Sequence, residues 1–214
     1  MELDYMNSLL KQNQNRMLLL GIVGPLVSLL CIALAIPLSP WFTWFGNALS
    51  DLGNYNNGFA VAILFNSGLI ISGLSCFLFT IWFLTKTRSI ALRFGMIVFA
   101  ISNVFLILIG IFSENAGSIH FTVSVGFFAT FPFAMWIAAA DFLRFKETRL
   151  YSIPSIVLPF ASIYLWYITF TDSAPWTGVA IPEIVTALTA ILWLYLLCAM
   201  IRWDILPKNV WNET

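Results

Sequence analysis

Charge is scarce in this chain. Of its 214 residues only 9% are Asp, Glu, Lys or Arg, whereas 60% are hydrophobic, and the formal net charge is zero. A water-soluble domain carries about 25% charged residues because its surface has to be hydrated. The composition therefore excludes a soluble globule, and the balanced charge provides no basic face for a nucleic acid partner. We expect lipid to cover most of the surface.

Histidine and cysteine are also scarce, which limits the metal chemistry open to the chain. His120 is the only histidine, and the three cysteines, Cys31, Cys76 and Cys198, each lie inside an apolar stretch. No two of them form a C-x-x-C pair. A cysteine in such a position behaves as a small hydrophobic residue. We therefore expect neither a disulfide nor a cysteine metal site.

Long apolar runs, by contrast, are abundant. About 20 apolar helical residues cross a hydrocarbon core of ~30 Å, and backbone groups in lipid have to bond within their own segment. Six stretches reach this length, at 17–38, 59–84, 94–112, 121–140, 153–171 and 184–201. The first exceeds the apolar core of a signal peptide, which indicates a retained helix. The sequence predicts an all-α, multi-pass membrane protein with a bundle of six transmembrane helices.

The basic residues predict the orientation of this bundle. All ten Lys and Arg residues lie in the N-terminal segment, the second and fourth loops, or the C-terminal segment, and the other loops have none. Basic loops stay on the cytoplasmic side of a membrane. We therefore expect an N-in/C-in protein of the cell membrane. Its parts are a polar cytoplasmic N-terminus at 1–16, the six-helix domain at 17–204 and a cytoplasmic tail at 205–214.

The outer loops contain carboxylates without a counter-charge. Asp51, Glu114, Asp172 and Glu183 lie on this side, and the only potential cation beside them is His120. Because like charges repel, protonation, hydrogen bonds, an imidazolium or a bound divalent metal has to relieve such a site. We predict Asp51, Glu114 and His120 as candidate catalytic residues, and these three with Glu183 as candidate metal ligands.

Each of these residues also has a structural interpretation. Asp51 can cap backbone amides of a turn in the long first loop, 39–58. Glu183 lies in the first turn of the sixth helix, where the helix dipole favours a carboxylate. His120 can be a hydrogen-bonded residue at a helix end, with Ser124 on the same inward face of its helix. On the sequence alone both interpretations stay open.

Other polar and aromatic residues are candidates for lipid contact. Trp41 and Trp44 belong to an aromatic cluster expected at headgroup depth. Asn66 and Asn103 lie inside predicted spans and need partners, so we expect them to link helices rather than line a transport path. The residues that we assign to lipid or substrate binding are Trp41, Trp44, Asn47, Ser50, Asn66 and Ser124.

Three stretches of the chain resemble a known family. N-A-L-S-D-L-G at 47–53, F-N-S-G at 65–68, and G-I-F-S-E at 110–114 followed by His120 are similar to a prokaryotic membrane family catalogued as domain of unknown function 998. A more distant similarity is to the eukaryotic FRAG/DRAM/Sfk group, which has a comparable S-D-x-G turn. The resemblance implies a six-helix fold with Asp51, Glu114, His120 and Glu183 as the matching polar positions. It implies no reaction, and the eukaryotic group is linked only to membrane-lipid handling.

Three functions of different classes fit these observations. The first, which we favour, is a binding or scaffold protein whose outer pocket holds a membrane lipid, a protein partner or a second copy of the chain. The second is an outer-leaflet lipid hydrolase or transferase, with or without a metal, although no G-x-S-x-G or H-E-x-x-H motif is present. The third is a transporter or channel, against which the lack of mid-membrane charge argues. Whether the chain is an enzyme stays open.

Overall fold

The computed structural model describes residues 2–212 and is built from six long helices. These are α1 (Glu2–Ala35), α2 (Phe59–Lys86), α3 (Ile90–Ile111), α4 (Ser118–Phe142), α5 (Arg149–Phe170) and α6 (Ala180–Arg202). Two short 3-10 turns, η1 (Leu49–Gly53) and η2 (Glu114–Ala116), lie in the connections. Each of the six helices is long and apolar enough to cross a membrane. The predicted all-α bundle with six spans is confirmed.

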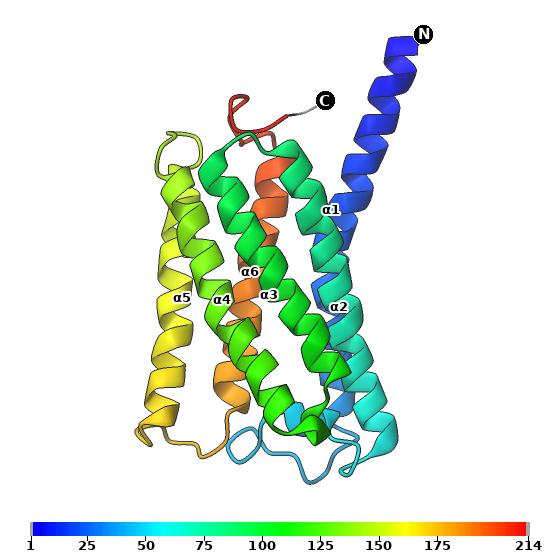
Figure 1. The fold of residues 1–214 in the computed structure, drawn as a ribbon, viewed down its shortest axis with the longest axis vertical. Helices are drawn as coiled ribbons and strands as arrows, with labels where there is room; N and C mark the ends of the chain where they lie inside the picture. Colours follow the sequence, from blue (N-terminus) through cyan, green and yellow to red (C-terminus); the bar gives the residue numbers. More distant parts are fainter. Residues whose placement is uncertain (1, 213–214) are drawn as a thin grey trace.

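All the helices except α2 begin before the apolar stretches from which they were predicted, and α1, α3 and α5 end one to three residues earlier. The largest difference is α1, which starts at Glu2 rather than near residue 17 and projects beyond the bundle (Figure 1). Its polar part contains neither Gly nor Pro, so nothing in it interrupts helical hydrogen bonding. α3 starts at Ile90 instead of residue 94 because Ser89 caps it, accepting a hydrogen bond from the Leu92 backbone N–H.

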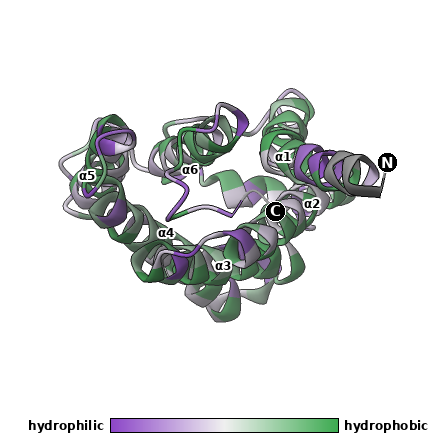
Figure 2. Ribbon diagram, turned by 90° about the horizontal axis from the view of Figure 1, so that it is seen from above, coloured by the Kyte–Doolittle hydropathy of each residue, from purple (hydrophilic) through white to green (hydrophobic). Residues whose placement is uncertain are grey.

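The six helices form a ring in chain order, which α6 closes by packing against α1 (Figure 2). Both termini and all loops with Lys or Arg lie at one end, which we call the basic end. The other end, which we call the carboxylate end, consists of residues 36–58, 112–117 and 171–179 with the adjoining helix termini. That the basic end faces the cytoplasm stays a prediction from the positive-inside pattern.

Two apolar clusters fill the ring, one towards each end. The cluster nearer the basic end is built around Trp193 of α6, which is wholly buried and packs edge-on against Phe99 of α3 at 5.2 Å between ring centroids. The cluster nearer the carboxylate end joins Leu49 and Leu52 of η1 to Phe65 of α2. The first loop is therefore part of the core.

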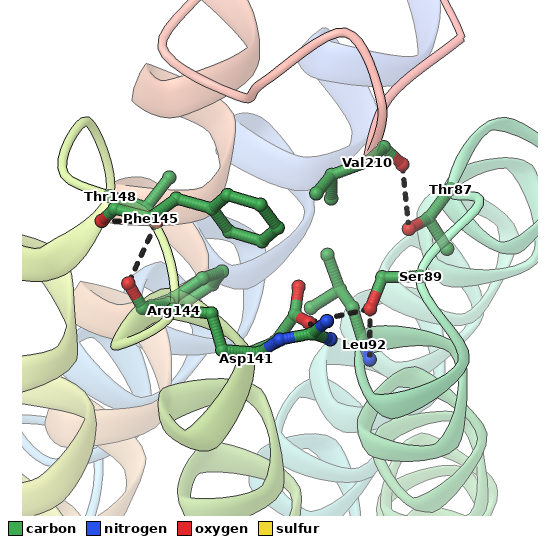
Figure 3. Close-up of polar contacts among 9 residues, drawn as sticks. Thr87, Ser89, Leu92, Asp141, Arg144, Phe145, Thr148 and Val210 are labelled. Atoms are coloured by element: carbon green, nitrogen blue, oxygen red, sulfur yellow. Dashed lines mark hydrogen bonds and ion pairs between the residues drawn. The ribbon is translucent and has the colours of Figure 1, made fainter.

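The C-terminal tail closes the basic end of the bundle. Val210 and Trp211 are buried, and the Trp211 ring lies 4.8 Å from that of Phe83. The Arg88 backbone N–H donates to the Val210 carbonyl at 2.7 Å, and the Thr87 hydroxyl donates to the same carbonyl (Figure 3). The tail is thus packed against the α2–α3 connection.

A buried carboxylate ties two helices together beside this tail. Asp141 of α4 is 1% exposed and accepts hydrogen bonds from the Ser89 hydroxyl at 2.6 Å and from Arg144 at 3.2 Å (Figure 3). A buried charge needs such partners, because it loses its hydration on folding. Asp141 therefore has a structural role between α3 and α4, far from the carboxylate end.

The two amides inside the spans both have partners. The Asn103 side chain of α3 donates to the Thr80 hydroxyl of α2 at 3.3 Å, so it links two helices as expected. For Asn66 the prediction of a link between helices is wrong, because its side chain donates to the Gly53 carbonyl of η1 at 2.9 Å. Asn66 lies only two turns into α2, within reach of the folded first loop, and it anchors that loop instead.

Candidate functional site

Asp51 organises the first loop by capping its 3-10 turn. One carboxylate oxygen, Oδ2, accepts hydrogen bonds from the Ala48 backbone N–H and from the Asn47 side-chain amide, both at 2.9 Å. This is the capping geometry that a carboxylate in a first helical turn adopts. The structural interpretation of Asp51 is confirmed, and its catalytic role stays a prediction.

Backbone hydrogen bonds hold the start of α6 against this loop. The Gly178 N–H donates to the Phe45 carbonyl at 2.8 Å, and the Ala180 N–H donates to the Asn47 carbonyl at 2.9 Å. The Glu183 carboxylate then accepts the Leu49 backbone N–H at 2.6 Å. Glu183 and η1 are 134 residues apart in sequence but lie side by side at the carboxylate end.

Glu114 reaches the same place from the loop between α3 and α4. Asn115 fastens this loop to the first one by accepting the Tyr55 backbone N–H at 2.7 Å and by donating to the Asn54 side chain at 2.8 Å. The Glu114 carboxylate accepts a long contact, 3.5 Å, from the Asn54 side-chain amide. Burial, and then a hydrogen bond and charge repulsion from Asp51, raise the pKa of Glu114 from its usual 4.5 to about 7.

His120 stands at the start of α4 with one nitrogen engaged. Nδ1 lies 2.7 Å from the Phe112 carbonyl oxygen, to which it donates, and the side chain is 8% exposed. Nε2 has no hydrogen-bond partner among residues 2–212. The structure therefore supports the predicted interface role and leaves the second ring nitrogen available to a ligand.

These groups border a cavity of about 590 Å³ between α4, α5 and the start of α6, which we call the lateral chamber. Its polar end is formed by Ser50, Glu114, His120, Ser124 and Glu183. Its walls are apolar and aromatic, and consist of Phe121, Val125, Phe128 and Ala129 of α4 with Ile163, Trp166 and Phe170 of α5. The chamber is therefore amphipathic, with the carboxylates and the imidazole at one end and Ser162 as the polar side chain of the α5 wall.

The lateral chamber opens sideways and reaches deep along the helices. Phe121 and Phe170, which line it, are 65% and 68% exposed on the outer surface of the bundle. Ala129 lies eleven residues after the first residue of α4, or about 16 Å along the helix axis. Half of a ~30 Å hydrocarbon core is one leaflet. The chamber therefore spans about the depth of one leaflet.

A second, smaller cavity continues from the chamber into the bundle. It has a volume of about 100 Å³ and lies between the two apolar clusters, with Asn103, Ser72 and Cys76 in its wall. Ser50, Ser124, Phe128 and Glu183 line both cavities. The polar end of the lateral chamber is thus the junction of the two.

The structure separates the predicted site residues into two groups. Glu114, His120, Glu183, Ser50 and Ser124 meet in the lateral chamber. The others lie outside its lining. Asn47 and Asp51 hold the first loop, Asn66 anchors it, and Trp41 and Trp44 are each 38% exposed on its surface. Lipid contact by these two tryptophans stays a prediction.

The predicted metal ligands do not form a recognisable metal centre. Among residues 2–212 no three His, Cys, Asp or Glu side chains are arranged so that they could hold a metal ion. Asp51 and Glu183 each use one oxygen on a backbone N–H, and His120 uses Nδ1 on a carbonyl. We therefore assign no metal to these residues.

The family described as "Protein of unknown function (DUF998)" matches residues 22–200, which include all six spans apart from the first part of α1 and the last residues of α6. The chain belongs to this family. No curated protein and no solved structure matches it significantly. Membership of DUF998 assigns no activity, so the function has to be argued from the site.

The α5 wall of the lateral chamber in this DUF998 member could not be predicted from the sequence. Ile163, Trp166 and Phe170 recur at spacings of three and four residues, which is equally typical of any lipid-facing helix. The α4 face could be predicted, because His120 and Ser124 lie one turn apart on the same side of the helix, and both line the chamber. Nothing in the α5 sequence shows that its stripe faces a cavity rather than lipid.

Glu114 predicts a pH dependence of stability. Because its pKa in the folded protein, about 7, lies above the usual 4.5, the folded state holds this proton more tightly than the unfolded state. The stabilisation is present in full below pH 4.5 and is lost as the pH rises through 7. We expect the thermal midpoint of unfolding in detergent to fall between about pH 5 and pH 8, and Glu114→Gln to flatten this slope.

The matched control for this experiment is Glu147→Gln, the same chemical change in an exposed loop at the basic end. It should leave the slope of the parent chain unchanged. An identical slope in the parent chain and in Glu114→Gln would contradict the assignment of the pH dependence to Glu114.

Proposed function

We propose that the protein binds a membrane lipid in the lateral chamber, with the headgroup at the polar end and an acyl chain between α4 and α5. One observation carries this proposal: a cavity of about 590 Å³ that is polar towards the carboxylate end, apolar and aromatic along α4 and α5, and open to the side. A lipid has the same distribution of polar and apolar surface. Sideways access also allows a lipid to enter without leaving the bilayer.

The headgroup contacts have to provide most of the affinity. Within a membrane an acyl chain gains little by moving from other lipid chains to a protein wall, because both surroundings are apolar. The polar end of the chamber offers carboxylates, two serine hydroxyls and the free Nε2 of His120. These groups are poorly solvated where they lie, so a headgroup that bonds to them replaces missing partners.

The loose attachment of α5 supports the same function. Of the six spans, α5 has the smallest buried share, and it contains Pro154 and Pro159 in its interior. Proline removes a backbone donor and loosens the helix locally. The helix that forms the outer wall of the chamber is thus the one that can move aside at the lowest cost.

Filling the chamber tests the proposal directly. We expect Ala129→Trp to lose lipid retained by the purified chain in native mass spectrometry. An indole that fills the space of the acyl chain reduces the binding free energy of the lipid by about 1–3 kcal/mol, or roughly 5- to 150-fold in affinity. Ala140→Trp is the matched control, since Ala140 is exposed on the same face of α4 three turns further on and does not line the chamber. Equal lipid retention by both variants would contradict lipid binding at this place.

A lipid hydrolase or transferase is the second candidate, favoured by one observation. Glu114, with its pKa of about 7, lines the chamber together with His120, and a group that titrates near neutrality is suited to proton transfer. Mass analysis of the retained lipid distinguishes the two functions. An intact lipid supports binding, whereas a lipid that the parent chain shortens and Glu114→Gln leaves intact supports the enzyme.

A further inference from the structure

The polar end of the lateral chamber has an excess of acceptors and of negative charge. Glu114 and Glu183 line it and Asp51 lies directly beside Glu114, while residues 2–212 place no Lys or Arg at the carboxylate end. The Leu49 N–H donates to Glu183, whereas Glu114, beside Asp51, receives a 3.5 Å contact from the Asn54 amide. A ligand with N–H donors and a positive charge supplies what these carboxylates lack.

An unpartnered hydroxyl points to the same place independently of the carboxylates. The Ser50 side chain is 9% exposed and lines both cavities, and its hydroxyl has no hydrogen-bond partner among residues 2–212. The Ser124 hydroxyl lines the same junction. Nearly all buried polar groups in folded proteins have a partner, so one without a partner beside a cavity indicates a missing ligand group.

Resting on the proposed lipid function, we infer that the headgroup is a primary amine of the phosphoethanolamine type, with its ammonium between Glu114 and Glu183. A primary ammonium has three donors, which match the two carboxylates and the Ser50 oxygen. Its phosphate lies towards the Ser124 hydroxyl, which can donate. Because Nδ1 of His120 donates to the Phe112 carbonyl, Nε2 of the neutral imidazole is an acceptor and adds to the acceptors that face the ammonium. An anionic headgroup without an amine brings no positive charge to Glu114, Glu183 and Asp51.

A competition between two lipids tests this headgroup assignment. The purified full chain is incubated in detergent at about pH 8, above the pKa of Glu114, with equal amounts of dioleoyl phosphatidylethanolamine and dioleoyl phosphatidylglycerol, which differ only in the headgroup. Native mass spectrometry then counts each lipid on the protein. We expect the ethanolamine lipid to be favoured roughly tenfold, the effect of about one additional charge-assisted hydrogen bond.

Substitutions assign this preference to the named carboxylates. Glu114→Gln and Glu183→Gln should each reduce the ratio of the two lipids towards one. The side-chain carbonyl introduced by Glu183→Gln is still able to accept the Leu49 N–H. If that variant nevertheless unfolds, the lipid ratio of Glu114→Gln tests the assignment by itself, because Glu114 makes a long contact with Asn54 and holds little of the fold. Asp172→Asn is the matched control, since Asp172 is an exposed carboxylate of the same end outside the chamber lining, and its ratio should stay that of the parent chain.

These experiments distinguish a failure of the headgroup assignment from a failure of the proposed lipid binding. If the parent chain retains both lipids equally or favours phosphatidylglycerol, while Ala129→Trp loses both, the amine assignment is overturned and the lipid chamber stands. If Ala129→Trp retains as much of both lipids as Ala140→Trp, the chamber itself is overturned. A divalent metal that the parent chain retains stoichiometrically and Glu114→Gln loses would also overturn the amine, because the metal would then supply the positive charge.

Discussion

Trp193→Ala is expected to lower the free energy of unfolding by about 3–5 kcal/mol, the usual cost of removing a large aromatic side chain from a filled core. Trp193 is wholly buried at the centre of the bundle and packs edge-on against Phe99 and Phe131 at 5.2 and 6.3 Å. Its indole N–H also donates to the Ser155 hydroxyl at 3.0 Å. Truncation leaves a void that the surrounding helices have to collapse around, and it removes a link between α5 and α6.

Unfolding of the purified chain by increasing sodium dodecyl sulfate in a mild detergent measures this loss. Trp203→Ala is the matched control, because Trp203 is 70% exposed at the end of α6 and should change the free energy by no more than about 0.5 kcal/mol. Trp193→Phe retains most of the packing and should lose less than the alanine variant. Similar losses for Trp193→Ala and Trp203→Ala would show that the centre of the bundle is not packed as described.

Gly178→Ala is expected to detach the start of α6 from the first loop. A Cβ at Gly178 would stand 2.2 Å from the Asn47 carbonyl oxygen and 2.5 Å from the Asn47 backbone nitrogen. Both atoms belong to the main chain, so no side chain can turn away to make room. Overpacking of this kind costs about 1–3 kcal/mol, and a rigid backbone neighbour places the cost towards the upper limit.

Amide hydrogen exchange measures this detachment locally. The Val179 and Ala180 N–H groups, which donate to the Asn47 carbonyl, should exchange faster by roughly 10- to 100-fold, as their local opening costs less. Thr177→Ala is the control, because it removes only a 3.2 Å side-chain hydrogen bond to Phe45 in the same loop. Unchanged exchange at Val179 and Ala180 in Gly178→Ala would contradict the docking of the two loops.

Gly178→Ala also has a consequence for the candidate site. Glu183 reaches the polar end of the lateral chamber because α6 is held against η1 through these backbone hydrogen bonds. If the loops separate, Glu183 leaves its position beside Leu49, and lipid retention should fall along with the protection of the amides. Stability and binding are therefore coupled at this end of the molecule.

The sequence determined the fold class, the number of spans and the gathering of carboxylates at one end. These features depend on the length and polarity of each segment, which a single residue and its near neighbours decide. The cap formed by Asp51 could be predicted for the same reason, since its partners Ala48 and Asn47 are three and four residues away in the sequence. Short-range patterns need no knowledge of which helix packs against which.

Only the tertiary structure decided which polar residues meet. Glu183 lies beside Leu49 through contacts that cross 134 residues, and Asn66 turns to a loop rather than to a helix. The aromatic stripe of α5 became a chamber wall for an equally non-local reason. In lipid, an apolar helix face has nearly the same free energy against a neighbour or against acyl chains, so hydrophobicity cannot rank the two. Shape, small residues and backbone hydrogen bonds between distant segments make that choice, and they become visible only when the bundle is assembled.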